Sequence, residues 1–203
     1  MYYKINSGVN KEKNICIKVA TIIDIPKILS LNDKWTIDSL EFMDKENGFL
    51  FCQRYDYKDL KKIINAREAT VAYSGDKVIG YFINDNYSKL LKKNQQAIEQ
   101  SKQLGLIPLN AKVSQRTQIV VEKEFHRQGI PKMMLNFIRP LLVSKYDILF
   151  SIGRNDNPKK AAHQGAGWEI IYENDTNYYC IFKLTNHNSK ATSPLAKRTL
   201  NHK

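Results

Sequence analysis

The hydrophobic positions of the chain follow two periods, and the clearest change from one to the other lies in its second half. Residues 116–121 end in the β-type run Ile119-Val120-Val121, and a charged turn with the single glycine Gly129 follows. After this glycine the apolar residues recur with the period of an amphipathic helix; they are Ile130, Met133, Met134, Phe137, Ile138, Leu141 and Leu142. We therefore predict a strand, a glycine turn and a long helix over 130–144, with a kink at Pro140.

Shorter patterns place further elements along the chain. Alternating or β-type runs predict strands at 14–20, 69–73, 78–84, 147–152, 168–172 and 178–184. Capping residues predict helices after Thr21 and Asp56, and Pro158 favours a short helix over 157–166. We expect residues 32–55 to be irregular and residues 86–114 to form an insertion with a helical centre over 89–103.

This order of elements predicts an α/β fold (α+β, three layers) with a mixed, mostly antiparallel sheet. A parallel β-α-β unit lies at its centre, made of the strand 116–121, the helix 130–144 and the strand 147–152. We expect a single domain over residues 1–186 and a basic, disordered tail over 187–203, where apolar residues are few.

Composition and charge narrow the class of protein. The 203 residues are 42% hydrophobic and 26% charged, as in one soluble globular domain. No apolar run approaches the about 18 residues of a membrane span, and the first residues lack a signal-peptide pattern. The isolated cysteines Cys16, Cys52 and Cys180 indicate reduced thiols, so we expect a cytoplasmic protein with no membrane partner and no metal site.

The formal net charge of +12 raises the question of a nucleic-acid partner. The basic residues are spread among acidic ones, and no stripe of alternating aromatic and basic residues is present. A diffuse positive field that attracts an anionic cofactor explains the charge as well. We therefore do not favour nucleic acid.

The turn before the long helix is the strongest candidate binding site. The first N–H groups of a helix have no intrahelical acceptor, and the helix dipole places partial positive charge there. His126, Arg127 and Lys132 surround this turn. Their combination predicts a site for a polyanion such as a pyrophosphate.

Three stretches together make the chain similar to the GNAT superfamily of acyl-CoA-dependent N-acetyltransferases. The first is the opening strand and cap, Val19 to Leu29. The second is the family's cofactor turn, Q/R-x-x-G-x-G/A, which the residues His126-Arg127-Gln128-Gly129-Ile130-Pro131 resemble, with Val121 eight residues before the glycine. The third is Asn157, a helix with His163, and the pair Gly167-Trp168. Histidine replaces the family's first Gln or Arg, and Pro131 lacks the N–H of the usual Gly or Ala.

The resemblance implies that acetyl-CoA lies in a V-shaped gap between the strands 116–121 and 147–152. The pantetheine arm would run along Ile119, Val120 and Val121, and the N–H of Val121 would polarise the thioester carbonyl. The remaining cofactor-binding candidates are His126, Arg127, Gln128, Gly129, Ile130, Pro131, Lys132 and Asn157. Asn157 is otherwise an ordinary helix cap.

The same resemblance suggests candidates for proton transfer. His163 aligns with the family's Tyr or His near the sulfur and is our general-acid candidate, although it could equally be a helix residue packed against Trp168. Glu122 is a weak candidate for the general base, and Glu124 and Asp85 are further carboxylates of this kind. Each of the three is more often a solvated turn residue.

We therefore expect an N-acetyltransferase that transfers an acetyl group from acetyl-CoA, by direct attack, to a primary amine of a small molecule or peptide. The segments 32–55 and 86–114 would recognise this acceptor. The alternatives are a non-catalytic acyl-CoA-binding module on the same fold and, as the weakest, a nucleic-acid-binding domain. A homodimer stays open.

Overall fold

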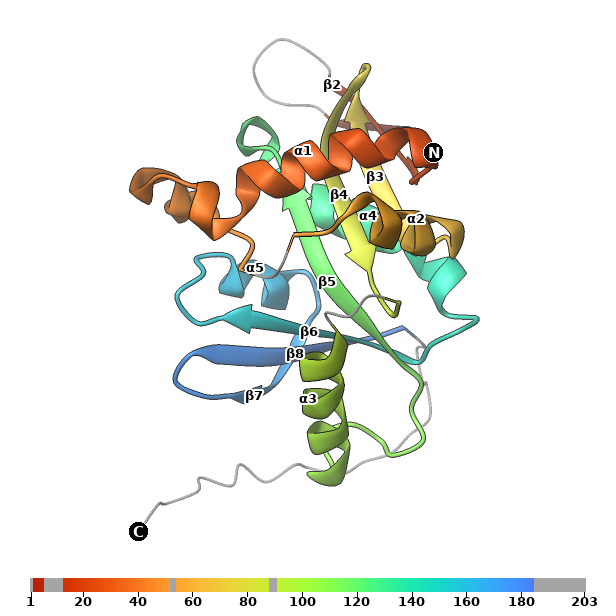
Figure 1. Cartoon of the computed structure of the whole chain (residues 1–203), viewed down its shortest axis with the longest axis vertical. Coiled ribbons are helices and arrows are strands. Elements are labelled where there is room, and N and C mark those ends of the chain that lie inside the picture. The colour runs from red at the N-terminus through yellow and green to blue at the C-terminus, as the bar shows by residue number, and fades with distance from the viewer. Residues whose placement is uncertain (1, 6–12, 52–53, 88–90, 185–203) are drawn as a thin grey trace.

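The computed structural model describes residues 2–5, 13–51, 54–87 and 91–184, and Figure 1 shows their arrangement. Eight strands form one sheet in the order β1-β2-β3-β4-β5-β6-β8-β7. They are β1 (Tyr2–Ile5), β2 (Lys13–Val19), β3 (Ala69–Ser74), β4 (Lys77–Asn84), β5 (Val113–Val121), β6 (Ile148–Arg154), β7 (Glu169–Glu173) and β8 (Asn177–Lys183). The α-helices are α1 (Ile25–Trp35), α2 (Tyr57–Asn65), α3 (Leu91–Gln103), α4 (Ile130–Leu142) and α5 (Lys160–Gly165). No helix in the described ranges is long and apolar enough to cross a bilayer.

The parallel pair β5–β6 lies at the centre of the sheet, and every other neighbouring pair is antiparallel. Its register covers three residue pairs, from Val113–Ile148 to Gln115–Phe150. Both strands continue beyond this point, to Val121 and Arg154, without further pairing to each other. They therefore separate into a V-shaped gap, and the predicted fold class with its central parallel unit is confirmed.

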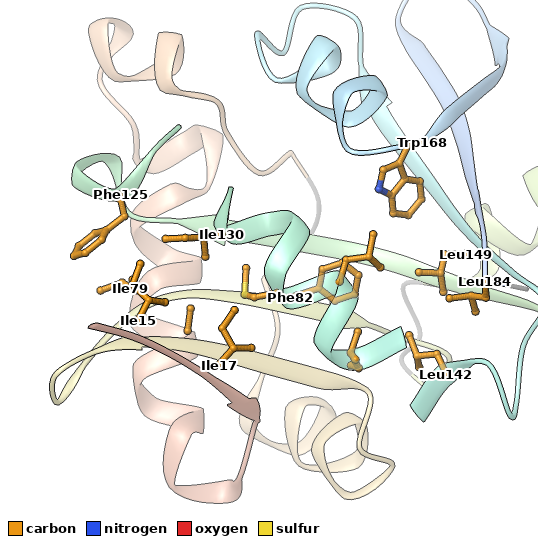
Figure 2. Close-up of a cluster of buried hydrophobic side chains, with 14 of the residues drawn as sticks. Ile15, Ile17, Ile79, Phe82, Phe125, Ile130, Leu142, Leu149, Trp168 and Leu184 are labelled. Carbon is orange, nitrogen blue, oxygen red and sulfur yellow. The ribbon is translucent and has the colours of Figure 1, made fainter. Parts of the chain in front are cut away.

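Helices cover both faces of the sheet and so form three layers. On one face α1 and α2 bury Ile25, Ile28, Leu60 and Ile63 against residues of β3, β4 and β5. On the other face α4 packs across the sheet with a second cluster, labelled in part in Figure 2: Ile15, Ile17, Ile79, Phe82, Phe125, Ile130, Leu142, Leu149, Trp168 and Leu184. This cluster joins the strands on either side of the gap, because Leu149 and Leu184 come from beyond it.

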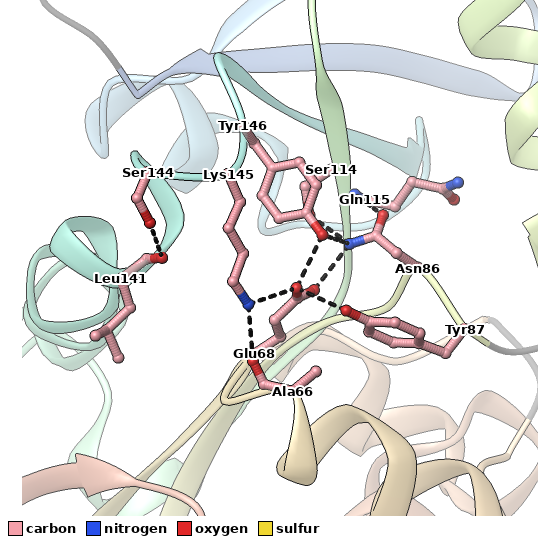
Figure 3. Close-up of polar contacts among 10 residues, drawn as sticks. All are labelled: Ala66, Glu68, Asn86, Tyr87, Ser114, Gln115, Leu141, Ser144, Lys145 and Tyr146. Carbon is pink, nitrogen blue, oxygen red and sulfur yellow. Dashed lines mark hydrogen bonds and ion pairs between the residues drawn. The ribbon is translucent and has the colours of Figure 1, made fainter.

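The predicted insertion packs against the C-terminal half of the sheet. Ile98 of α3 lies in a third cluster with Ile107, Ile148 and Phe150. Figure 3 shows the polar contacts at its first residues. The fully buried carboxylate of Glu68 accepts hydrogen bonds from the side chains of Asn86 (2.8 Å), Tyr87 (3.0 Å) and Tyr146 (2.8 Å). It also forms an ion pair with Lys145 (3.3 Å). Glu68 thus links the start of β3 to the chain before α3 and to the chain before β6.

Two predicted boundaries were wrong, and local contacts explain each. Residues 32–35 belong to α1 rather than to an irregular segment, because Asn32 and Trp35 continue the buried face of that helix. The helix α5 begins at Lys160 and not after Asn157, because Asn157 folds into a turn whose side chain accepts a hydrogen bond from the Lys159 N–H (3.0 Å). The predicted tail over 187–203 lies outside the described residues.

Candidate functional site

The gap between β5 and β6 opens into a cavity of about 330 Å³. Its walls come from the separated strands, the start of α4, α5 with the residues before it, and the chain between α1 and α2. The lining includes Arg116, Thr117, Ile119 and Val121 of β5, Gly153 of β6, Arg127, Pro131, Lys159, His163, Trp168 and Tyr178. The predicted site residues that line this space are Ile119, Val120, Val121, His126, Arg127, Pro131, Asn157 and His163. The cavity wall does not include the predicted residues Gln128, Gly129, Ile130, Lys132 and Glu122.

The wide end of the cavity is the turn before α4. Arg127 (φ 61°) and Gly129 (φ 71°) both have left-handed backbones. Left-handed residues within a turn can direct neighbouring N–H groups toward one side, as in an anion-binding nest, and we call the turn 126–132 the nest. Gly129 is also the N-cap of α4, and Pro131 occupies the first turn, where it supplies no N–H. The turn therefore offers backbone donors at a helix N-terminus, one fewer than a chain without Pro131.

Lys159 is a second cation at this end, and the sequence reasoning missed it. It lines the cavity, and its alkyl chain lies over Gly48: a Cβ at Gly48 would come within 2.6 Å of the Lys159 Cγ. Burial and the nearby Arg127 lower the pKa of Lys159. Neither Lys159 nor Arg127 makes a salt bridge to a carboxylate among the described residues. Two positive charges thus converge on the nest, as an anionic ligand requires.

The ring of His126 contacts the end of β5 as well as lining the cavity near the turn. Its Nε2 lies 2.9 Å from the Val121 carbonyl oxygen, and burial lowers its pKa. A neutral ring with its proton on Nε2 donates to this carbonyl. The Glu122 N–H donates to Ile79 of β4 (2.8 Å), and successive residues of a strand point to opposite sides. The N–H groups of Val121 and Ile119 therefore face the gap. The Val121 carbonyl oxygen faces it too, but already accepts a hydrogen bond from His126.

At the narrow end three polar side chains form a chain of contacts. Arg116 Nη2 lies 2.9 Å from His163 Nε2, and His163 Nδ1 lies 2.6 Å from the Tyr178 hydroxyl. Arginine can only donate, so Nε2 accepts and the proton of the ring is on Nδ1. Burial and the charge of Arg116 lower the pKa of His163 to about 2, so the ring is neutral. Burial raises the pKa of Tyr178 to about 12.

These hydrogen bonds determine what Tyr178 can do. His163 donates from Nδ1 to the Tyr178 oxygen, which leaves the Tyr178 proton to point elsewhere, and both side chains line the cavity. The hydroxyl lies over Gly153 of β6, where a Cβ would come within 2.3 Å of its oxygen. His163 also packs against Trp168, with ring centroids 6.0 Å apart. Both of the readings considered for His163 are therefore compatible with its position.

The predicted carboxylates lie elsewhere. Glu122 does not line the cavity; its buried carboxylate forms an ion pair with Lys34 (2.6 Å). Asp85 is fully buried and not a solvated turn residue as expected. Glu124 is exposed. Of the three, none has its carboxylate on the cavity wall.

Asn157 connects two walls of the cavity. Its Nδ2 donates to the Phe49 carbonyl (2.9 Å). Phe49 belongs to a loop whose ends are joined by Leu50 N–H to Trp35 O (2.8 Å) and Ile37 N–H to Leu50 O (2.8 Å). This loop, residues 37–49, therefore reaches across the gap from α1 and touches the residues before α5.

Solved proteins share this fold. A GNAT-family acetyltransferase from Listeria monocytogenes superposes with a TM-score of 0.56 at 16% identity, over 89% of this chain and 99% of that chain. The chain has the GNAT acetyltransferase fold. The PaiA N-acetyltransferase from Thermoplasma acidophilum, in complex with coenzyme A, gives a TM-score of 0.56 at 11% identity, over 83% and 98%.

Arabidopsis thaliana Naa50, in complex with the bisubstrate analogue CoA-Ac-MVNAL, gives a TM-score of 0.54 at 16% identity, over 83% of this chain and 98% of that chain. No protein-family model and no curated protein matches the sequence. The likeness to the GNAT fold therefore lies in three dimensions, at identities where sequence alone gives little signal.

Proposed function

We propose that the chain is an N-acetyltransferase that takes its acetyl group from acetyl-CoA and transfers it to a primary amine of a small molecule or peptide. The observation that carries this proposal is the gap between β5 and β6, with a nest and two cations at its wide end and a polar chain at its narrow end. Solved proteins with this fold hold CoA or a CoA-peptide analogue, which supports the same use of the gap here.

The residues present fit a CoA-like ligand. The turn 126–132 would bind the pyrophosphate through backbone N–H groups, with Arg127 and Lys159 supplying charge. The N–H groups of Ile119 and Val121 face the gap and would hold the pantetheine arm or the thioester carbonyl. The Val121 carbonyl already accepts a hydrogen bond from His126. The Ile119 carbonyl would therefore be the acceptor for an N–H of the pantetheine arm. Asn157 would hold the wall of residues 37–49 over the arm.

The narrow end would serve the departing sulfur. Tyr178 would donate a hydrogen bond to the thiolate as the C–S bond breaks, and Arg116 would add positive charge behind it. With a pKa of about 12, Tyr178 holds its proton more tightly than a thiol of pKa about 8.5, so it stabilises the thiolate without full proton transfer. His163 would act through Tyr178 by fixing the direction of its O–H. Most of the acceleration would come from alignment of amine and thioester.

Calorimetric titration with acetyl-CoA, desulfo-CoA and ATP tests the cofactor site. Micromolar binding of both CoA species, with ATP at least about tenfold weaker, is the expected result. Release of free thiol is then followed with a panel of amines: a lysine-containing peptide, a peptide with a free α-amino terminus, spermidine and glucosamine. Absence of CoA binding would contradict the proposal at its first step.

A non-catalytic acyl-CoA-binding module is the second candidate, and Pro131 favours it because it removes a donor from the nest. This candidate predicts CoA binding without thiol release for every amine. The variant Pro131→Ala restores the N–H and should tighten CoA binding by about 3- to 10-fold, the effect of one hydrogen bond. Turnover by the unmodified chain would exclude the non-catalytic reading.

A further inference from the structure

The wall of the cavity next to Arg116 contains an irregularity in β5. Opposite β4, Gln118 pairs with Ile83 and Arg116 pairs with Asn84, so Thr117 is an extra residue between two pairs. Such a bulge bends the strand and redirects a side chain. Here Thr117 lines the cavity on the same stretch of strand as Arg116, at the narrow end.

Two further side chains extend from Thr117 into the interior. Thr117 Oγ1 lies 2.6 Å from the Tyr55 hydroxyl, which lies 3.0 Å from Asp85 Oδ2. The other carboxylate oxygen, Oδ1, accepts the Tyr87 N–H (2.8 Å). Tyr55 is 5% exposed and Asp85 0%, and neither lines the cavity. The two hydroxyls therefore connect a buried carboxylate to the cavity wall.

The donors and acceptors of Thr117, Tyr55 and Asp85 determine the direction of the hydrogen bonds between them. A carboxylate only accepts, so the single proton of Tyr55 points to Asp85. The contact of 2.6 Å between Tyr55 and Thr117 then needs the Thr117 proton. The Ile83 carbonyl lies farther from Thr117 Oγ1, at 3.4 Å. Thr117 therefore donates inward to Tyr55, so these hydrogen bonds run from the cavity wall toward Asp85.

We propose that Thr117, Tyr55 and Asp85 form a proton relay that removes the proton from the acceptor amine. This inference rests on the proposed acetyl transfer and supplies its missing base. The amine nitrogen forms a bond to the acetyl carbon, and the C–S bond breaks with its electron pair leaving on sulfur. The surplus nitrogen proton passes to Thr117, the Thr117 proton to Tyr55, and the Tyr55 proton to Asp85. The products are a neutral amide, the CoA thiolate and a protonated Asp85. After product release, the proton of Asp85 returns through Tyr55 and Thr117 to water in the cavity, which restores the carboxylate.

A purely structural role makes different predictions for conservative variants. In that case Tyr55 would anchor the chain between α1 and α2 to β5, and loss of its hydroxyl would lower stability and leave the chemical step unchanged. A relay instead needs a hydroxyl group at positions 55 and 117, and the rest of each side chain matters less. Thr117→Ser keeps the hydroxyl and Thr117→Val keeps the shape, so the pair separates the two roles at a half-buried position.

The test measures kcat, the KM for acetyl-CoA and the Kd for CoA of the whole chain and its variants. The acceptors are the amine of the panel that releases thiol fastest, and water alone. Thr117→Val and Tyr55→Phe should each lower kcat about 100-fold with CoA affinity within about 2-fold, since proton transfer contributes about 10²–10⁴. Thr117→Ser should keep kcat within about 3-fold, and the double variant should be no slower than either single one, as for residues that act as a unit.

Equal kcat losses in Thr117→Ser and Thr117→Val, or an unchanged kcat in folded Tyr55→Phe, would overturn the relay and leave acetyl transfer standing. A chain that binds CoA but releases thiol with neither amine nor water would overturn acetyl transfer and the relay together. If Tyr55→Phe does not fold, as judged by circular dichroism, the Thr117 pair alone decides.

Discussion

Single residues in the cavity owe their chemistry to burial more than to their type. His163 is a histidine that stays neutral, because burial and the neighbouring Arg116 lower its pKa to about 2. It therefore accepts from Arg116 and donates to Tyr178, which a charged ring could not do. The sequence identified His163 through its distance from Gly167, but its partners come from β5 and β8 and left no signal nearby.

This histidine predicts a dependence of stability on pH. Between the folded pKa of about 2 and the unfolded value of 6.5, the unfolded state binds the additional proton. The contribution is therefore fully present above pH 6.5 and is lost as the pH falls, by at most about 1.4 kcal/mol per pH unit. Urea unfolding at pH 7, 6 and 5 should show a smaller slope for His163→Gln than for the parent chain. Parallel slopes would mean that His163 is solvated.

The positive charge of Lys159 should strengthen the binding of an anionic ligand such as CoA. Lys159→Met keeps the alkyl chain over Gly48 and removes the charge that converges with Arg127. We expect CoA affinity to fall about 10-fold, the value of one charge-assisted hydrogen bond. Calorimetry at two salt concentrations measures it. The matched control is Lys61→Met on the exposed side of α2, which changes the net charge equally; an equal loss there would assign the effect to the overall field.

The absence of a side chain at Gly153 leaves room for the ring of Tyr178. A Cβ at Gly153 would lie 2.2 Å from the Tyr178 ring carbon Cζ, so Gly153→Ala must displace that ring. We expect a loss of about 1–3 kcal/mol in the free energy of unfolding, as for other overpacked sites, and a lower kcat. Gly165→Ala in α5 is the control, because nothing lies within 4 Å of its Cβ position. Equal stability of the two variants would show that Tyr178 does not lie over β6.

At the scale of elements, periodicity predicted what local sequence determines. The spacing of Ile130, Met134 and Ile138 alone identified α4, because one face of that helix is buried. The bulge at Thr117 had no such signal, since the polar run Ser114 to Gln118 fits a regular strand equally well. The polar chain from Asp85 to Thr117 joins segments 30 and 62 residues apart along the chain. Contacts of this kind are formed by packing and cannot be derived from spacing.

The contacts of Glu68 predict how the insertion is held. Glu68→Gln keeps the shape but removes the charge that four groups share, so we expect about 2–4 kcal/mol of destabilisation. Chemical unfolding measures this loss. CoA affinity of the folded variant should stay unchanged, because Glu68 does not line the cavity. The surface variant Glu169→Gln, which breaks an exposed pair with Lys183 (3.1 Å), should cost less than about 0.5 kcal/mol; a comparable cost would argue against a special role for Glu68.

For the whole molecule, the order of elements was enough to predict the fold class, whereas the site divided into two parts. At its wide end, the turn from His126 to Lys132 could be proposed from the sequence, because it is continuous along the chain and its physics is local, whereas Lys159 was missed. Its narrow end was only partly predicted: His163 was found, but Arg116, Tyr178 and Thr117 were not. These three side chains meet only after the sheet has formed.

The short junction between β5 and β6 has a consequence for cooperativity. Three residue pairs join the five strands before the gap to the three after it, and the packing of α4 supplies much of the remaining connection. We therefore expect that, without ligand, the smaller half opens in local fluctuations that spare the larger one. A molecule bound along β5 and against α5 would bridge both halves. Amide hydrogen exchange should therefore slow on CoA binding in β6 and β8, far from the turn, more than in β3; uniform slowing would indicate a single cooperative unit. The cofactor would then act as a removable part of the scaffold as well as a reactant.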